Sequence, residues 1–379
     1  MTEWKECKIA DLGTVIGGAT PSTKDSANYE NGTIAWITPK DLSTFTGRYI
    51  KRGERNITEI GLKSCSTQLL PPNSVLFSSR APIGYIAIAA NEVCTNQGFK
   101  SVIPNDDTDP LFLYYLLKYN KDKIESMGSG TTFKEVSGNT MKGISVRVPT
   151  DISIQKRISA VLGMIDDKIE ENERINDNLE QQASALFKSY FVDFEPTYGV
   201  VPDSWQEYRL GDFLPVITGK KNANISSATG KYPFFSCSQD IAWTNEYSFD
   251  GSAILVAGNG DFNVKFYDGK FEAYQRTYVL IPNNARYTAW LYYAVKYNLN
   301  KITMAARGSV IKFITKGNLE DFTFYAPCNL NGEPIIDHFT VINKTIAANR
   351  SENIRLSELR DTLLPKLMSG ELDVSAIEL

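Results

Sequence analysis

Two short polar loops carry side chains that could form hydrogen bonds with the edges of DNA bases. Each loop follows a run of β-branched and aromatic residues that predicts a strand, at residues 74–77 and again at 253–256. Arginine pairs with guanine, asparagine with adenine, and aspartate accepts a hydrogen bond from cytosine. The candidate residues are Ser78, Ser79, Arg80, Asn259, Asp261 and Asn263. A solvated turn is the ordinary alternative for each loop, because polar loops are common on protein surfaces.

A second pair of loops, at residues 128–134 and 307–312, has the composition of a phosphate-binding segment. Glycine lets the backbone approach a ligand closely, and Ser, Thr and Lys side chains suit phosphate oxygens. The candidate contacts are Ser129, Thr131, Thr132, Lys134, Arg307, Ser309 and Lys312. The sequence does not separate base contacts from phosphate contacts in either pair of loops.

Residues for catalysis are sparse. The single histidine, His338, excludes a His-based triad or metal site, and no Gly-x-x-x-x-Gly-Lys-Ser/Thr segment is present for nucleotide hydrolysis. Residues 258–260 lack the third glycine of a dinucleotide loop and predict a turn. Asp261 with residues 268–270 loosely resembles a metal-dependent nuclease site, but Asp-Gly at 268–269 is favoured as a hairpin turn. We therefore predict no catalytic residue, no metal and no cofactor.

The chain contains an internal repeat, which constrains the fold more than any single motif does. Residues 4–12 match residues 205–213 at a spacing of 201, and Leu-Tyr-Tyr at 113–115 matches 291–293 at a spacing of 178. The second copy is therefore about 23 residues shorter near its start. In each copy we expect short strands, one helix around the Tyr-Tyr pair, and a strand that ends at the final proline of the copy.

A long helix is predicted after each copy. Apolar residues recur at spacings of three and four over residues 158–190 and over 335–367, which is the pattern of a coiled-coil seam. A stripe of about 33 residues spans roughly 50 Å, more than one small domain can cover, so we expect the two helices to pair antiparallel. The central seam positions are Ile165, Ile169, Asn172, Asn176, Leu179, Ile342, Ile346, Asn349, Asn353 and Leu356. The asparagines are expected to meet at the seam and to fix its register.

Composition places the acidic charge on the helical segments. The chain has a formal net charge of -4, yet residues 1–150 hold 17 basic and 15 acidic residues, whereas residues 151–200 hold 5 and 10. Five widely spaced cysteines indicate reduced packing residues. With no signal peptide or membrane-spanning segment apparent, we expect a cytoplasmic protein with no membrane partner.

The order of domain, helix, domain and helix resembles the specificity subunit of type I restriction-modification systems. The resemblance covers essentially the whole chain. It rests on the openings at Trp4 and Trp205, on residues 36–42 and on the loop at 130–134. The second copy has no clear counterpart of residues 36–42, and residues 232–236 occupy the nearest place.

This resemblance implies two target recognition domains, each of which reads one half of a bipartite site in double-stranded DNA, with the helices setting the gap. It implies a subunit that is not an enzyme and has no cofactor of its own. Such a subunit recruits two adenine methyltransferase subunits and, through them, restriction subunits. Lys40 and Lys220 complete the candidate DNA contacts.

We therefore expect an α+β fold with two mixed α/β recognition domains and two long antiparallel helices that form a coiled coil, related by a pseudo-twofold internal repeat. The expected segments are residues 1–150, 151–195, 196–332 and 333–379. The alternative is a two-headed scaffold that binds carbohydrate or protein, which the aromatic content and the negative charge would also suit.

Overall fold

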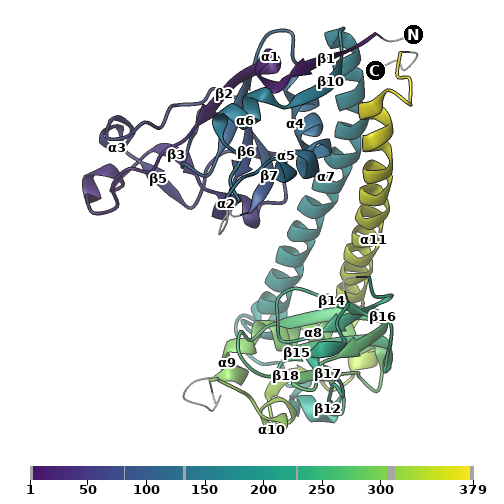
Figure 1. The fold of residues 1–379 in the computed structure, drawn as a ribbon. Coiled ribbons are helices and arrows are strands. Elements are labelled where there is room, and N and C mark those ends of the chain that lie inside the picture. Colours follow the sequence, from purple (N-terminus) through teal and green to yellow (C-terminus); the bar gives the residue numbers. More distant parts are fainter. Residues whose placement is uncertain (1–2, 81, 131–133, 228, 305–311, 376–379) are drawn as a thin grey trace. The chain divides into compact units, whose positions relative to one another are not determined.

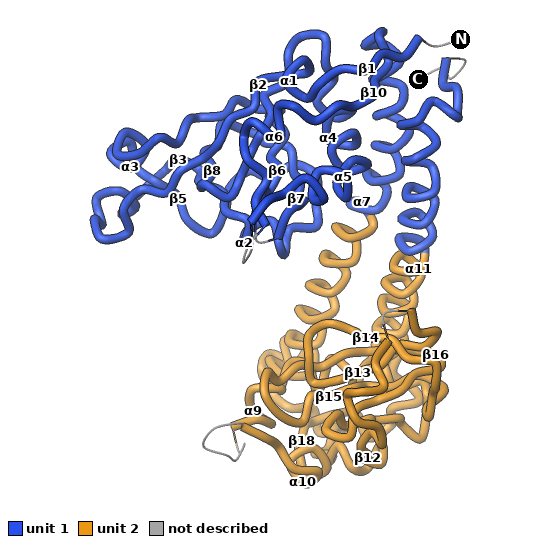
Figure 2. Tube along the Cα trace, viewed as in Figure 1, with its two compact units in different colours: residues 1–171, 352–379 blue, residues 172–351 orange. Residues whose placement is uncertain are grey.

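The computed structural model describes residues 3–80, 82–130, 134–227, 229–304 and 312–375. The chain forms two compact units, residues 1–171 with 352–379 and residues 172–351 (Figure 2). Two long helices, α7 (Ile152–Phe191) and α11 (Pro334–Ser369), are labelled in Figure 1, and each contributes residues to both units (Figure 2). The packing units thus divide both helices, whereas the four segments expected from the sequence keep each helix whole.

The first unit contains three small sheets. Antiparallel β1 (Trp4–Lys8) and β10 (Ser145–Pro149) form one sheet. A second sheet has the order β2 (Gly13–Gly17), β9 (Lys100–Pro104), β6 (Val75–Ser79), β7 (Ile83–Ala89) and β4 (Tyr49–Ile50). The third has the order β5 (Arg55–Ile57), β3 (Ile34–Ile37) and β8 (Cys94–Thr95). The shorter helices are α1 (Ile9–Leu12), α2 (Pro39–Ser43), α3 (Glu59–Lys63), α4 (Pro110–Tyr119), α5 (Lys121–Ser126) and α6 (Gly138–Gly143).

The second unit contains two sheets. Antiparallel β11 (Trp205–Arg209) and β18 (Thr323–Pro327) form one. The other has the order β12 (Val216–Thr218), β17 (Thr277–Leu280), β15 (Phe249–Ala257), β16 (Val264–Ala273), β13 (Tyr232–Phe235) and β14 (Ala242–Thr244). Its shorter helices are α8 (Thr288–Tyr297), α9 (Leu299–Thr303) and α10 (Lys316–Glu320). No helix in the described ranges of the chain is long and apolar enough to cross a membrane.

The repeat predicted from the sequence is confirmed by strand register. Trp4 lies opposite Pro149 in one two-stranded sheet, and Trp205 lies opposite Pro327 in the other. The Tyr-Tyr segments form α4 and α8, which are apolar on nearly all sides and therefore buried. In each unit this helix packs in one core with the central sheet and with parts of both long helices.

One turn prediction was wrong. Asp268 and Gly269 lie within β16, where they face Ser252 and Gly251 of β15, and the connection between these strands is residues 258–263. Gly251 and Gly269 both have positive φ, at 124° and 127°. Two glycines directly across the ladder tolerate a local backbone conformation that other residues rarely adopt, so the strands continue through it.

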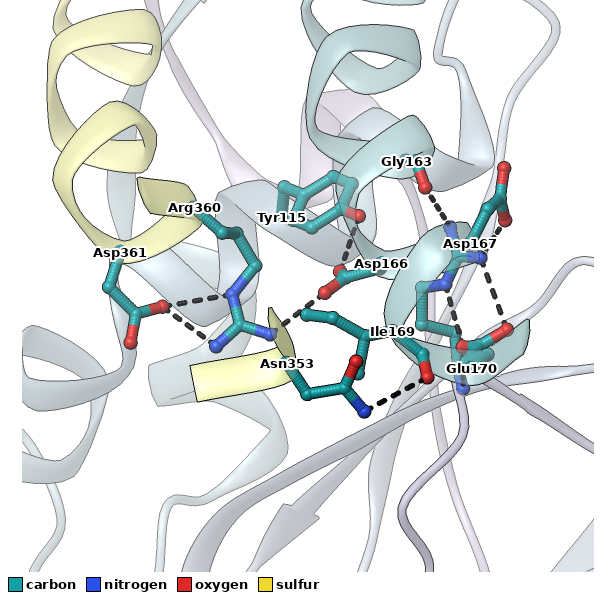
Figure 3. A network of polar contacts seen from close by, with 10 residues as sticks. Tyr115, Gly163, Asp166, Asp167, Ile169, Glu170, Asn353, Arg360 and Asp361 are labelled. Atoms are coloured by element: carbon teal, nitrogen blue, oxygen red, sulfur yellow. Dashed lines mark hydrogen bonds and ion pairs between the residues drawn. The ribbon is translucent and has the colours of Figure 1, made fainter. Parts of the chain in front are cut away.

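A buried tyrosine in α4 joins this helix to both long helices (Figure 3). The Tyr115 hydroxyl of α4 donates to Asp166 Oδ2 of α7 at 2.6 Å, and Arg360 Nη1 of α11 donates to Asp166 Oδ1 at 2.8 Å. Burial and the Asp166 carboxylate raise the pKa of the Tyr115 phenol, which therefore remains a donor. Burial disfavours the charge on Arg360, but the hydrogen bonds and the charges of Asp166 and Asp361 together outweigh burial and raise the pKa of Arg360.

The second unit uses the same tyrosine with uncharged partners. Tyr293 of α8 donates to Asn343 Oδ1 of α11 at 3.0 Å, and Asn343 and Asp166 occupy equivalent positions 177 residues apart. The residue equivalent to Arg360 is Ala183, which is buried. The first unit therefore has an ionic cluster at the position where the second has a neutral hydrogen bond.

Within each unit the halves of the long helices run antiparallel. Asn176 Oδ1 accepts from Asn349 Nδ2 at 2.9 Å in the second unit, and Asn353 Nδ2 donates to the Ile169 carbonyl at 3.3 Å in the first. All of the central seam positions predicted from the sequence are buried or half-buried. Asn176, Asn349 and Asn353, which interrupt the apolar stripe, thus take part in helix pairing.

We predict that Arg360→Ala lowers the free energy of unfolding by about 3–5 kcal/mol, because it leaves the buried Asp166 carboxylate without its charged partner. Adding Asp166→Asn reproduces the neutral arrangement of the second unit and should recover a large part of the loss. Denaturant unfolding measures both effects. Lys316→Ala is the control, because the Lys316–Glu320 pair is exposed and its loss should cost under about 1 kcal/mol. A double variant no more stable than Arg360→Ala would contradict this account.

Candidate nucleic-acid interface

The two predicted loops of the first copy lie side by side. Val136 N donates to the Ser79 carbonyl at 2.9 Å, and Ser79 N donates to the Gly98 carbonyl at 2.7 Å. Asn96 N, in the same turn as Gly98, donates to Ile37 O at the end of β3 at 3.0 Å. Backbone hydrogen bonds thus bring together residues 79–80, 96–99, 134–136 and the end of β3. These residues form the loop cluster of the first unit.

The second unit has an equivalent loop cluster, made of residues 258–261, 274–277, 312–314 and the end of β13. Ile314 N donates to the Gly258 carbonyl at 3.0 Å, Gly258 N to Arg276 O at 2.9 Å, and Tyr274 N to Phe235 O at 2.9 Å. The backbone bonds match those of the first unit one for one, although most of the side chains differ. β13 pairs parallel with β16, as β3 pairs parallel with β8. Residues 232–236 therefore take the place in the second copy that residues 36–42 have in the first, as the sequence predicted.

One glycine lets a further segment approach each loop cluster. A Cβ atom at Gly18 would lie 2.1 Å from the Thr95 carbonyl oxygen, and one at Gly219 would lie 2.1 Å from the Ala273 carbonyl oxygen. Gly18 and Gly219 are the repeat-equivalent residues 201 positions apart. The glycines are required because a backbone carbonyl occupies the space that any side chain would need.

In the first unit the cationic candidates lie at the surface of the loop cluster. The Arg80 side chain is 35% exposed, with Nη1 3.8 Å from Glu135 Oε2, and Lys100 Nζ lies 3.4 Å from Glu135 Oε1. Ser129 is exposed and pairs through its backbone with Glu135, and Lys134 is exposed. Glu135 therefore holds two cations beside the predicted phosphate loop.

Lys40 is the candidate on α2, the helix that follows β3. Its Nζ donates to Glu54 Oε2 at 2.8 Å, and this hydrogen bond raises the pKa of the Lys40 ammonium. Both side chains are largely exposed, so the pair is a weak one that a phosphate could replace.

Ser78 and Ser79 are buried and have structural roles. β6 continues through both residues, and neither side chain is exposed. Ser78 Oγ donates to the Pro82 carbonyl at 2.8 Å and accepts from Tyr85 N at 2.8 Å, and Ser79 Oγ donates to the Gly98 carbonyl at 3.2 Å. Their hydroxyls hold the loop, so the expectation that they contact DNA is dropped.

In the second unit Asn259, Asp261, Lys220 and Lys312 are at least partly exposed, whereas Asn263 is buried. Asn263 Nδ2 donates to the carbonyls of Cys237 and Asp261 at 3.0 and 2.9 Å, so it closes the loop between β15 and β16 and is not a DNA contact.

Asp261 Oδ2 accepts from Gln239 Nε2 at 2.9 Å. A pocket of about 220 Å³ in the loop cluster of the second unit includes Asn259, Gln275, Arg276 and Phe313 in its lining. Burial lowers the pKa of Lys265, whose Nζ donates to the Ser238 carbonyl at 2.6 Å.

Four candidates, Thr131, Thr132, Arg307 and Ser309, lie outside the described residues. Among the residues that the structure does describe, no group of three His, Cys, Asp or Glu side chains is placed to hold a metal ion.

Sequence reasoning missed the turn that lies in the middle of each loop cluster. Gln97 and Gln275 are exposed on these turns and lie 178 residues apart, which is the spacing that relates most of the repeat. Applying that spacing to every polar residue would have identified the pair.

Two loop clusters on one repeated frame, together with two long helices, are the arrangement that the sequence predicted for a type I specificity subunit. The chain belongs to the family described as type I restriction modification DNA specificity domain, whose pattern matches residues 1–181 and 202–358. The family recognises DNA sequence, and specificity subunits are the non-catalytic components of restriction systems.

Several proteins are similar to this chain. The type I restriction enzyme MjaIX specificity subunit of Methanocaldococcus jannaschii is 33% identical over 417 residues, covering 99% of this chain and 95% of that protein. The EcoDI specificity subunit of Escherichia coli is 35% identical over 178 residues, covering 46% of this chain and 40% of that protein. The crystal structure of a type I S subunit from M. genitalium has a similar fold, with a TM-score of 0.64, 16% identity, and coverage of 97% and 96%.

We predict that Gly18→Ala destabilises the chain by about 1–3 kcal/mol, because the new methyl group collides with the Thr95 carbonyl and must displace the turn at Gln97. Gly17→Ala is the matched control, since nothing lies within 4 Å of a Cβ atom there. Thermal unfolding of the two variants measures the difference. Equal stability of the two variants would show that the close approach at Gly18 is unimportant.

Proposed function

We propose that this chain is the DNA-reading specificity subunit of a type I restriction-modification complex, and that each recognition domain reads one half of a bipartite site through its loop cluster. The observation that carries this proposal is the repetition of the same backbone hydrogen bonds around different side chains. A shared frame with different polar groups suits two domains that bind the same polymer and read different sequences.

We further propose that the long helices set the gap between the two half-sites and dock partner subunits. Residues 151–200 hold 5 basic and 10 acidic residues, and residues 333–379 hold 5 and 8, so these segments repel DNA phosphates more than they attract them. Met164 on α7 and Val341 on α11 occupy equivalent positions and are 57% and 63% exposed. Equivalent apolar side chains on two helices support the binding of two copies of one protein partner.

The partners in this proposal are two methyltransferase subunits and, through them, restriction subunits. Binding to chromosomal DNA would place the complex in the cytoplasm. The domain boundaries at residues 150, 195 and 332 remain part of the proposal, with each helix acting as one spacer.

Lys134→Ala and Lys312→Ala test whether the loop clusters bind DNA. Each variant removes one exposed cation, so we expect weaker binding to all duplex sequences and a salt dependence whose slope falls by about one. Fluorescence anisotropy at several salt concentrations, with the chain alone and with methyltransferase subunits, measures this. Lys142→Ala is the control, because Lys142 is exposed on α6, which packs against α1 and β2. Binding that is indifferent to salt and to sequence would overturn the proposal in favour of a non-DNA scaffold.

Replacing both Asn176 and Asn349 by leucine tests the spacer role. The two residues hydrogen-bond across the helix pair, and leucine should preserve the helices while loosening their register. Selection from a library of random DNA duplexes should then yield half-sites at more than one spacing. A single unchanged spacing, with unchanged helicity by circular dichroism, would contradict this role.

A further inference from the structure

Gln97 and Gln275 stand at the centre of the two loop clusters and have the same side chain where their neighbours differ. We propose that each glutamine reads an adenine base, one in each half of the DNA site. This inference rests on the function proposed above and assigns a shared base contact to it.

The two glutamines occupy equivalent turns. Phe99 N donates to the Asn96 carbonyl at 3.3 Å, and Thr277 N donates to the Tyr274 carbonyl at 2.8 Å. These bonds close four-residue turns in which Gln97 and Gln275 are the second residue. Both side chains are exposed, so their amide groups are available to a ligand.

Each turn is held on both sides by the backbone. The first residue of the turn is bonded to the end of β3 or β13, and the third residue accepts a hydrogen bond from Ser79 N or Gly258 N. The turn can therefore present a side chain at a fixed place, which is what recognition of a single base requires.

The chemistry of the amide favours a base over a phosphate. Glutamine offers one acceptor and one donor side by side, which match the N6 amino group and N7 of adenine in the major groove. A neutral amide releases no counterions from phosphates, and the cations Arg80, Lys100 and Lys134 in the first unit already serve that purpose. In the first unit Thr20 Oγ1 donates to Gln97 Oε1, which orients the amide and leaves its NH₂ group free to donate.

The residues around the glutamines differ between the copies. Gly98 follows Gln97, whereas Arg276 follows Gln275, and Arg80 lies on the loop where the second unit has Asn259. Gln275 lines the pocket that contains Asn259 and Tyr278. Side chains that differ suit the bases that differ between half-sites, and the side chain that is the same suits a base that both half-sites contain.

The test compares full-length wild type, Gln97→Ala and Gln275→Ala in selection from random duplexes, followed by affinity measurements on the selected site. Wild type should require adenine at one position in each half. A bidentate contact favours the correct base over the wrong ones by roughly 5- to 150-fold in affinity. Each alanine variant should lose this preference for adenine at that position, in one half of the site only. The intact half serves as an internal control for folding. Gln206→Ala, an exposed glutamine on β11, should change nothing.

A second variant tests the chemistry directly. Gln97→Glu replaces the donor with an acceptor, so preference at its position should move from adenine to cytosine. If the alanine variants bind all sequences more weakly by the same factor, the glutamines contact phosphates. If the variants keep wild-type selectivity and affinity, the glutamines make no contact with DNA. Either result overturns this inference while sequence-specific binding by wild type upholds the proposed function. Wild type without sequence preference would overturn both.

Discussion

The positions of the loop clusters depend on a buried phenol. Tyr115 and Tyr293 lie in α4 and α8, which pack against the central sheets. Each buried hydroxyl needs a hydrogen-bond acceptor, because burying a donor without one costs free energy. The acceptors, Asp166 and Asn343, lie on the long helices. One hydrogen bond per unit therefore fixes α4 or α8 against a long helix. The central sheet and its loops are positioned in turn by packing against α4 or α8. The tyrosine is the same in both units, whereas its acceptor is charged and paired with Arg360 in the first unit and neutral in the second.

Backbone hydrogen bonds join the loops of each cluster, whatever exposed side chains the loops carry. The bonds that join residues 79, 98 and 136 in one unit and 258, 276 and 314 in the other involve only peptide N–H and C=O groups. A change in the exposed side chains of these loops leaves the backbone bonds in place, provided that Gly18 and Gly219 keep their close approach to the neighbouring carbonyls. The buried side chains of Ser78, Ser79 and Asn263 belong to the frame as well, because each is hydrogen-bonded to the backbone of its loop.

The repeat, the paired helices and the strands that end at Pro149 and Pro327 could be predicted because they depend on periodic patterns. The site was predictable only in outline. Ser78 and Ser79 resemble loop residues in composition, but β6 continues through them because Ser79 pairs with Ile83 and Ser78 pairs with Phe99, and the second pairing joins residues too distant in sequence to be visible in a local pattern. Asp268-Gly269 was interpreted as a turn because the facing Gly251 could not be recognised from local sequence. The repeat spacing relates Gln97 to Gln275, but their place between the predicted loops depends on backbone hydrogen bonds that no local pattern indicates.

The polar residues on the long helices determine register, which apolar packing alone leaves loosely specified. Leucine and isoleucine side chains at spacings of three and four would also pack after a shift of one turn. Such a shift in the first unit would bring Leu356 or Leu364 opposite Asp166 in place of Arg360 and leave the buried Asp166 carboxylate without its cation. In the second unit it would separate Asn176 from Asn349. Burial of an ion pair contributes little net stability by itself, but the cost of breaking it makes the alternative registers unfavourable. Because each recognition domain is attached to the helices through its tyrosine, the register of the helix pair within a unit also sets the place of the loop cluster along the helices.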